Sequence, residues 1–132
     1  MPAPLGKVPT RKMPDVQVFG RDDSPDTRAA IRFFRERLVV VRYSDLRKQP
    51  IAPRELRRFT ERVGARALLD ETSRPYRDGG LAYLSLDEAG IVARLLADPR
   101  LLRLPLARSG NAVTVGRAEA IWAEWIRSAA AP

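Results

Sequence analysis

A near-continuous apolar run, Leu38-Val39-Val40-Val41-Arg42-Tyr43, limits the possible folds of this chain more than any other feature. Its short length and β-branched content predict a strand, and its lack of polar alternation predicts that this strand is buried on both faces. A second β-rich run, Val16-Gln17-Val18-Phe19-Gly20, precedes it and ends in glycine. The two predicted strands flank a helical pattern, and a β-α-β unit of this kind requires a parallel sheet.

The segment between these strands carries the signals of a helix start. Ser24 is a typical N-cap residue, Pro25 suits the first helical position, and Asp26 is favourable at the positive end of the helix dipole. The residues that follow at helical spacing form one apolar stripe: Thr27, Ala30, Ile31 and Phe34. We expect this helix to end near Arg37.

The middle of the chain is predicted to be mostly helical. Pro53 opens a helix that ends at Gly64, and a short helical turn follows over residues 65–69. The core side of the first of these helices is expected to carry Leu56, Phe59 and Val63. The polar residues 73–80 are expected to form a loop. The motif Ser85-Leu86-Asp87-Glu88 then has the pattern of a capping box, with Ser85 as N-cap of a helix that runs to about Ala97.

The last third of the chain has the pattern of a β-hairpin and a final helix. Residues 104–108 and 112–115 read as strands on either side of Ser109-Gly110-Asn111, which has turn chemistry. The helix over residues 118–128 has a broad apolar face made by Ala118, Ile121, Trp122, Trp125 and Ile126. The whole order is β-α-β, inserted helices, then β-β-α. That order predicts the α/β class and a thioredoxin-like fold with a four-stranded mixed sheet.

Length and charge set the domain organisation that we expect. The 132 residues suffice for one domain, which we assign to residues 15–128. Residues 1–14 are rich in proline and carry Lys7, Arg11 and Lys12, so we expect a flexible basic N-terminal tail. The tail has no apolar stretch of the kind found in secretory signals, and no apolar run approaches the roughly 20 residues of a membrane-spanning helix. We therefore expect a cytoplasmic protein that does not enter a membrane.

The amino-acid composition excludes several kinds of chemistry. The chain has no cysteine, so it has no disulfide, no thiolate nucleophile and no thiolate-bound metal. It has no histidine, which is the commonest general base and metal ligand. A nucleophilic serine would need a lysine or carboxylate as its base, and the lysines are Lys7, Lys12 and Lys48. We expect no metal and no cofactor.

The net charge of +8 permits an acidic partner, such as an acidic protein or a nucleic acid. One basic stripe, Arg54, Arg58 and Arg62, recurs every four residues on the face opposite Leu56 and its neighbours. Glu55 and Glu61 interrupt the region, and no aromatic residue is interleaved for base stacking. The pattern favours a solvated helix face and argues against a nucleic-acid ligand.

Several segments together resemble one family, the ArsC-type arsenate reductases and the related Spx regulators of bacteria. The resemblance runs from about Val16 to Ile126, and no single segment decides it; their order and spacing do. The matching segments are residues 16–20, Thr27-Arg28-Ala29-Ala30, Arg66-Ala67-Leu68-Leu69, Arg74-Pro75-Tyr76, residues 98–106 and Val113-Thr114-Val115-Gly116-Arg117. The resemblance implies a thioredoxin-like fold with a cis peptide bond between Leu104 and Pro105.

The resemblance also implies a degenerate active site. The reactive cysteine of the family falls on Ser24, and the first two of its three anion-binding arginines fall on Asp70 and Leu104. Only the third arginine has a counterpart, Arg117, which is the candidate anion-binding residue. The residues expected to line this cleft are Asp22, Asp23, Asp26, Asp70, Leu104 and Pro105.

Ser24, Pro25 and Asp26 have a structural interpretation, in which they form a helix cap and nothing more. They also have a functional one, in which the carboxylates around Ser24 form an acidic cleft that recognises a cationic segment of a partner. For the protein as a whole, the first interpretation is a redox-inactive binding or regulatory module that is not an enzyme, and the Spx resemblance implies RNA polymerase as its partner. The alternative is an arsenate reductase-like, glutaredoxin-linked oxidoreductase, although this chain lacks the cysteine that such a reaction needs.

Overall fold

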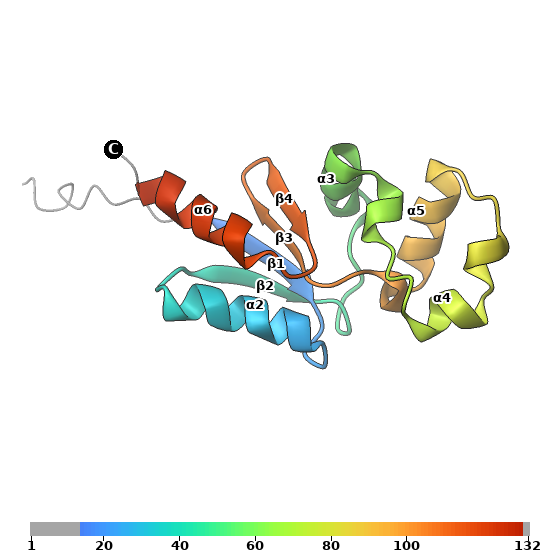
Figure 1. Cartoon of the computed structure of the whole chain (residues 1–132), viewed down its shortest axis with the longest axis horizontal. Coiled ribbons are helices and arrows are strands. Elements are labelled where there is room, and N and C mark those ends of the chain that lie inside the picture. Colours follow the sequence, from blue (N-terminus) through green and yellow to red (C-terminus); the bar gives the residue numbers. More distant parts are fainter. Residues whose placement is uncertain (1–13, 131–132) are drawn as a thin grey trace, which may run out of the picture.

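A computed structural model describes residues 14–130 of the chain, and Figure 1 shows the arrangement of its elements. The helices and strands are β1 (Val16–Gly20), α2 (Pro25–Glu36), β2 (Val41–Asp45), α3 (Pro53–Val63), α4 (Arg74–Asp78), α5 (Glu88–Ala97), β3 (Leu106–Ser109), β4 (Ala112–Val115) and α6 (Glu119–Ala130). Short 3-10 turns cover Ala65–Leu68, Leu81–Tyr83 and Pro99–Leu101. The predicted basic tail lies outside the described residues, apart from Pro14.

The strands form one mixed sheet in the order β2-β1-β3-β4. β1 runs parallel to β2, with Val16 opposite Val41, and antiparallel to β3, with Val16 opposite Ser109. β3 and β4 form an antiparallel hairpin whose turn contains Gly110 at a φ of +61°. The predicted α/β class and four-stranded mixed sheet are therefore confirmed.

One face of the sheet is covered by α2 and α6, and an aromatic cluster fills the space between these helices (Figure 1). The Trp122 ring lies 5.6 Å from the ring of Phe33 and 5.4 Å from that of Phe34. Its indole N–H donates a hydrogen bond of 2.8 Å to the hydroxyl of Thr114 on β4, and both side chains are buried. This bond satisfies a polar group that burial would otherwise penalise.

The remaining helices, α3, α4 and α5, gather beyond one end of the sheet (Figure 1). They form a second core cluster with Phe19 of β1 and Leu106 of β3. Phe19 meets Phe59 of α3 edge-on, with ring centres 5.9 Å apart. A short bridge between Leu69 and Leu102 joins this group to the segment that leads into β3. Among residues 14–130, no helix is both long and apolar enough to pass through a membrane.

The prediction that the run from Leu38 to Tyr43 is buried on both faces is wrong. β2 begins only at Val41 and lies at the edge of the sheet, while the side chains of Leu38 and Val40 are 84% and 80% exposed. The first residues of the run instead close α2, because the amides of Leu38 and Val39 donate to the carbonyls of Arg35 and Phe34. Val39 turns inward, at 3% exposure, and Val41 and Tyr43 are partly buried against the same core cluster.

Two further expectations need correction in the helical part. Residues 73–80 are not all loop, because Ser73 accepts a hydrogen bond from the Tyr76 amide and opens α4, whose Tyr76 is buried. Ser85 does not cap α5; Asp87 does, since its carboxylate accepts from the Gly90 amide at 2.8 Å.

Val63 was expected on the core side of α3, yet its side chain is 43% exposed. The reason is its place in the last turn of α3, beyond the two buried side chains of that helix, Leu56 and Phe59. The prediction that Gly64 ends α3 is confirmed, since this residue adopts a φ of +83°.

Replacement of Leu38 by glycine is expected to stabilise the fold. Leu38 has a φ of +61°, a conformation that costs a side-chain-bearing residue about 1 kcal/mol and glycine almost nothing. Because the side chain is 84% exposed, its loss removes little buried surface. We expect Leu38→Gly to raise the free energy of unfolding by about 0.5–1 kcal/mol in urea denaturation. Val40→Gly is the control and should lower it; a destabilised Leu38→Gly would contradict the prediction.

Removal of the Thr114 hydroxyl is expected to destabilise the fold through the indole that it satisfies. Thr114→Val leaves the buried N–H of Trp122 without its acceptor, at a cost of about 1–3 kcal/mol. Urea denaturation measures the loss. In a Trp122→Phe background there is no N–H to satisfy, so the same Thr114→Val change should cost much less. Equal costs in both backgrounds would show that the hydrogen bond does not contribute.

Candidate functional site

The candidate site begins where β1 passes into α2. A Cβ on Gly20 would lie 2.4 Å from the side chain of Thr27, so glycine is what lets the first turn of α2 approach the end of β1. The turn between them closes with a hydrogen bond of 3.0 Å from the Ser24 amide to the Arg21 carbonyl. This geometry brings the N-terminus of α2 to the C-terminal end of β1.

Ser24 occupies the N-cap of α2, as predicted. Its backbone is extended, and its Oγ accepts a hydrogen bond of 3.1 Å from the Thr27 amide. Pro25 stands at the start of the helix and Asp26 in its first turn. The serine oxygen is thus engaged in capping, and among residues 14–130 no carboxylate or lysine is hydrogen-bonded to it.

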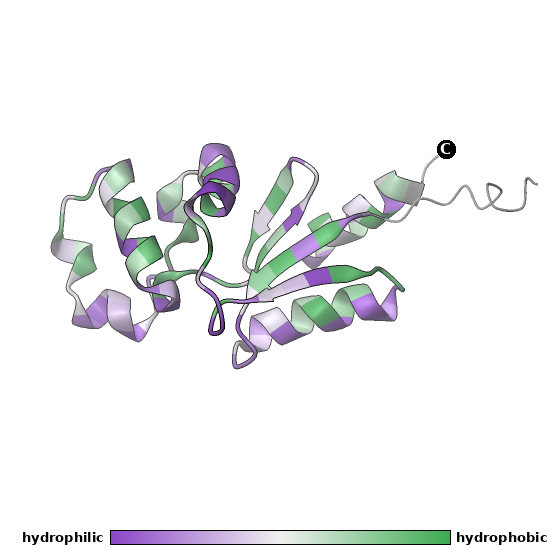
Figure 2. Ribbon diagram, turned by 180° about the vertical axis from the view of Figure 1, so that it is seen from behind, coloured by the Kyte–Doolittle hydropathy of each residue, from purple (hydrophilic) through white to green (hydrophobic). Residues whose placement is uncertain are grey.

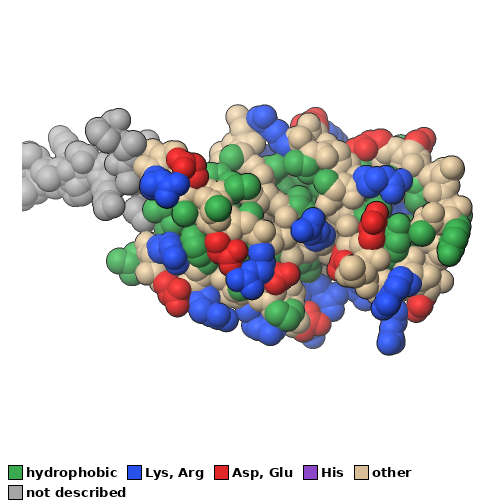
Figure 3. Space-filling view, in the orientation of Figure 1, with side chains coloured by type: hydrophobic (Ala, Val, Ile, Leu, Met, Phe, Trp, Pro, Cys, Tyr) green, Lys and Arg blue, Asp and Glu red, His purple; other side chains and the backbone are tan. Residues whose placement is uncertain are grey.

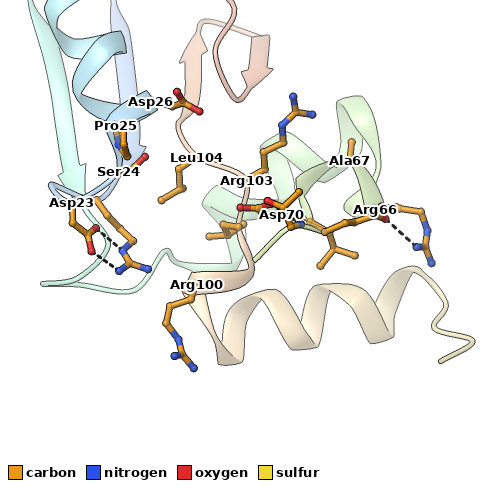
Figure 4. Close-up of a pocket in the computed structure, with 15 residues that line it drawn as sticks. Asp23, Ser24, Pro25, Asp26, Arg66, Ala67, Asp70, Arg100, Arg103 and Leu104 are labelled. Atoms are coloured by element: carbon orange, nitrogen blue, oxygen red, sulfur yellow. Dashed lines mark hydrogen bonds and ion pairs between the residues drawn. The ribbon is translucent and has the colours of Figure 1, made fainter. Parts of the chain in front are cut away.

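A cleft of about 720 Å³ opens beside this N-terminus, between α2 and the helical part of the molecule (Figure 4). Ser24, Asp23, Asp26, Asp70 and Leu104 all line it, so the structure brings these predicted residues together. Its charged lining residues are Arg21, Asp23, Asp26, Arg66, Asp70, Glu71, Arg100 and Arg103. Four arginines therefore stand against four carboxylates, and the cleft is balanced in charge where the sequence had suggested an acidic one.

The carboxylate of Asp23 is neutralised by its neighbour. The Arg21 guanidinium donates two hydrogen bonds to it, of 3.1 and 2.8 Å, and these hold the pKa of Asp23 below its usual value. Asp22 lies elsewhere: it lines a separate hollow of about 480 Å³ and accepts a 2.8 Å hydrogen bond from the Tyr43 hydroxyl. Burial and this bond together raise the pKa of Tyr43. Asp22 is therefore not part of the Ser24 cleft.

Asp70 is used in a local turn. One of its carboxylate oxygens accepts hydrogen bonds from the Thr72 amide at 3.0 Å and from the Thr72 hydroxyl at 2.6 Å. The Asp70 carbonyl accepts from the Ser73 hydroxyl, which in turn caps α4. This residue shapes the approach to α4 in addition to lining the cleft.

Arg117 lies next to the cleft, but carboxylates already surround it. Its guanidinium forms an ion pair with Glu119 and lies 4.0 Å from a carboxylate oxygen of Asp26. The hydrogen bond from Arg117 keeps the pKa of Glu119 low. The arginine therefore neutralises acidic side chains at the start of α2 and α6.

The Leu104–Pro105 peptide bond is cis, as the resemblance implied. Leu104 lines the cleft, whereas Pro105 is fully buried beneath it. The Pro105 carbonyl accepts a hydrogen bond of 2.9 Å from the amide of Gly116, a residue with a φ of +76°. This contact fixes the end of β4 against the cleft segment.

Arg103 is the most important residue that the sequence analysis missed. Its guanidinium has no ion pair within residues 14–130. It packs against Gly116, since its Nε lies 2.9 Å from the place that a Cβ on that glycine would occupy. Arg100, by contrast, is held by two hydrogen bonds to Asp98, of 3.0 and 2.9 Å. The signal for Arg103 was present in the sequence: it stands one residue before Leu104, on which the family arginine falls.

The cleft presents fixed charges and a serine that caps a helix. The only family position for a nucleophile holds a serine whose oxygen caps a helix. In the described part of the chain, no group of three or more acidic, histidine or cysteine side chains could hold a metal ion. What the cleft offers is a set of fixed charges around an open hollow, and one of its arginines, Arg103, has no ion pair within residues 14–130.

Comparisons with known proteins agree with this architecture. The model of the ArsC family matches residues 19–125 of the chain. A solved YFFB protein superposes with a TM-score of 0.77 and 22% identity, over 88% of this chain and 99% of its own. An arsenate reductase from Vibrio cholerae gives a TM-score of 0.75 and 16% identity, over 85% of this chain and 98% of its own. No curated protein sequence matches significantly. The structural likeness establishes the thioredoxin-like fold.

Replacement of Ser24 by alanine is expected to destabilise α2 without changing the cleft's charge. The change removes the acceptor for the Thr27 amide, which should lower the free energy of unfolding by about 1 kcal/mol. Ser24→Asp is the matched control, because its carboxylate can accept the same hydrogen bond. Thermal or urea denaturation measures the loss of stability in each variant. Equal losses in the two variants would show that the capping hydrogen bond contributes nothing.

Proposed function

This chain belongs to the ArsC family, and on that premise we propose that it is a redox-inactive member that acts as a binding or regulatory module. One observation carries the proposal: the sequence contains no cysteine, and Ser24 stands at the nucleophile position. A thiol ionises near neutral pH at a helix N-terminus, whereas a serine hydroxyl needs a base to become nucleophilic. The hydrogen bond that Ser24 accepts from Thr27 serves the helix and supplies no such base.

The charges of the cleft support retained binding. Asp23 is neutralised by Arg21, while Arg103 has no carboxylate partner among residues 14–130. An acidic cleft would suit a cationic ligand, but the charges of this cleft are balanced. A ligand with an anionic group could approach Arg103 without meeting an unpaired Asp23. Loss of the thiol therefore does not require loss of a ligand.

The alternative is a glutaredoxin-linked oxidoreductase of the arsenate reductase kind. The family membership and the position of Arg103 beside Leu104 favour it. It would need the attacking thiol to come from another molecule, such as glutathione, because this chain has none. Activity measurements with added thiols separate this alternative from the binding module.

The partner and the location belong to the proposal as well. The resemblance to Spx regulators makes RNA polymerase the first partner to test, and a cytoplasmic location goes with that role. The immobilised chain should retain purified RNA polymerase in a pull-down at physiological salt. The Arg103→Ala variant tests whether the cleft contributes, and Arg127→Ala on α6 is its surface control. Absence of retention would exclude this partner.

The purified protein is not expected to reduce arsenate. Turnover with glutathione, glutaredoxin or thioredoxin as reductant should equal that of a control without protein, because this chain has no thiol of its own to attack arsenate. A reductase from the same family serves as the positive control. Turnover that depends on this chain would contradict the proposal and favour the alternative.

Ser24→Cys is expected to restore a reactive thiol but no turnover. The new thiol would lie at the N-terminus of α2, which favours a thiolate, and the ion pair of Asp23 with Arg21 weakens the opposing effect of that carboxylate. The pKa of the new thiol should therefore fall below the free value of about 8.5. Ser128→Cys, near the C-terminal end of α6, is the matched control and should keep a pKa at or above that value. The pH dependence of iodoacetamide labelling measures both. Clear arsenate turnover by Ser24→Cys would show that Asp70 and Leu104 have not disabled the anion site.

A further inference from the structure

The outer edge of β2 offers an unused site for strand addition. The sheet order places β2 at one border, and β1 pairs with it on one side only. Within residues 14–130, no strand pairs with its other side. Figure 2 shows β2 at this border, next to α2. An exposed row of backbone donors and acceptors is a template for another extended chain.

Two aliphatic side chains project into solvent just before this strand. Leu38 and Val40 are 84% and 80% exposed, more than any other large aliphatic residue described. Figure 3 shows apolar side chains protruding at the end of the molecule where α2 passes into β2. Exposed apolar residues that lie together, unlike scattered ones, indicate a surface that contacts something.

The backbone of Leu38 adds a second observation. It is the only non-glycine residue with a positive φ in the described part of the chain, at +61°. Glycine at this position would remove both the backbone strain and the exposed leucine. A leucine that is unfavourable to the fold on both counts points to a contact outside the fold.

A groove of about 390 Å³ runs beside the strand and gives the contact its chemistry. It is lined from α2 by Ile31 and Arg35 and from the following segment by Leu38, Val39, Val40, Val41 and Tyr43. Arg35 is the only charged residue in this lining, and its guanidinium has no ion pair among residues 14–130. The groove therefore suits an aliphatic ligand that also carries a carboxylate.

We propose that an extended segment of another protein, with alternating aliphatic and acidic residues, adds as a strand to the free edge of β2. Because successive side chains of a strand point to opposite faces, its aliphatic side chains lie on the face of Val40, and its carboxylates lie on the face of α2, where one of them meets Arg35. A second copy of this chain fits less well. A two-fold contact brings the same surface from both copies together, and the groove contains no carboxylate to pair with Arg35.

This site is independent of the proposed function of the Ser24 cleft. Ser24 and Asp26 lie at the start of α2, whereas Arg35 and Leu38 lie at its far end. The two sites share no lining residue. A result that rules out ligand binding at one site therefore says nothing against the proposal for the other site.

The test uses the full chain, labelled with ¹⁵N, and a capped peptide of alternating valine and glutamate. We expect amide shifts to change along residues 38–45 and at Ile31 and Arg35, and not around Ser24. Val40→Lys should weaken binding at least about tenfold, since it places a charge against the aliphatic side chains of the added strand. Val63→Lys, which changes an exposed valine on α3, is the matched control and should bind like the natural chain.

Further peptides separate backbone pairing from simple apolar contact. A peptide with lysine in place of glutamate should bind at least about tenfold more weakly, because it repels Arg35. Two further peptides are N-methylated, one at the valine nitrogens and the other at the glutamate nitrogens. Alternate N–H groups of a strand point to the same edge and an added strand pairs through one edge only, so one of these two peptides should lose binding and the other should keep it. Equal binding of the two methylated peptides, or a lysine peptide that binds as tightly as the glutamate peptide, would overturn the proposal.

Two outcomes would assign the groove to a different occupant and also overturn the proposal. If Val40→Lys converts a dimer of the free chain into a monomer in analytical ultracentrifugation, the occupant is a second copy. If Val40→Lys shifts the signals of residues 1–13 in the free chain, the occupant is the chain's own N-terminal segment. A monomer whose first residues do not respond, together with the peptide results above, would support the proposed partner.

Discussion

The close approach of α2 to the end of β1 is the contact on which the rest of this structure depends. Gly20 leaves no room for a Cβ, which would lie 2.4 Å from Thr27, and Thr27 is completely buried. Any larger residue at position 20 would push the first turn of α2 away from the sheet. Because Ser24 and Asp26 belong to that turn, the position of the cleft is set by a packing contact several residues away from it.

Charge in this molecule is balanced over very short distances. Arg21 holds Asp23, Arg100 holds Asp98, and Arg117 holds Glu119, so each pair is only two residues apart in the sequence. Exposed pairs of this kind contribute little to stability. They do decide the local electrostatics, because a carboxylate with an arginine beside it no longer repels an anion as a bare one does. Acidic residues counted one by one around Ser24 therefore overstate the negative charge of the cleft.

The sequence predicted the features that depend on neighbouring residues. The Ser24 cap, the hairpin turn at Gly110 and the end of α3 at Gly64 all follow from local backbone chemistry, and the structure has each of them. The parallel pairing of β1 with β2 also followed, because a β-α-β unit requires a parallel sheet.

What the sequence did not reveal depends on tertiary contacts. The apolar run at Leu38 predicted a strand buried on both faces, yet β2 lies at the edge of the sheet, because its place depends on which strands pair with it. α4 was missed because a buried tyrosine, Tyr76, holds a short polar helix that local propensity alone would not predict. Arg103 was missed because the family arginine falls on its neighbour Leu104, and only the structure shows where the guanidinium of Arg103 lies.

The division of the core into two clusters has a consequence for the dynamics of the cleft. One cluster lies under α2 and α6 and the other among α3, α4 and α5, and the cleft is lined from both sides of this division. Units of this kind open separately in hydrogen exchange, each with its own free energy. Opening of the α3–α5 unit would remove Arg66 and Asp70 from the cleft while Ser24 stays in place. A ligand that contacts both sides must therefore slow amide exchange throughout α3, α4 and α5, far from any atom that it touches.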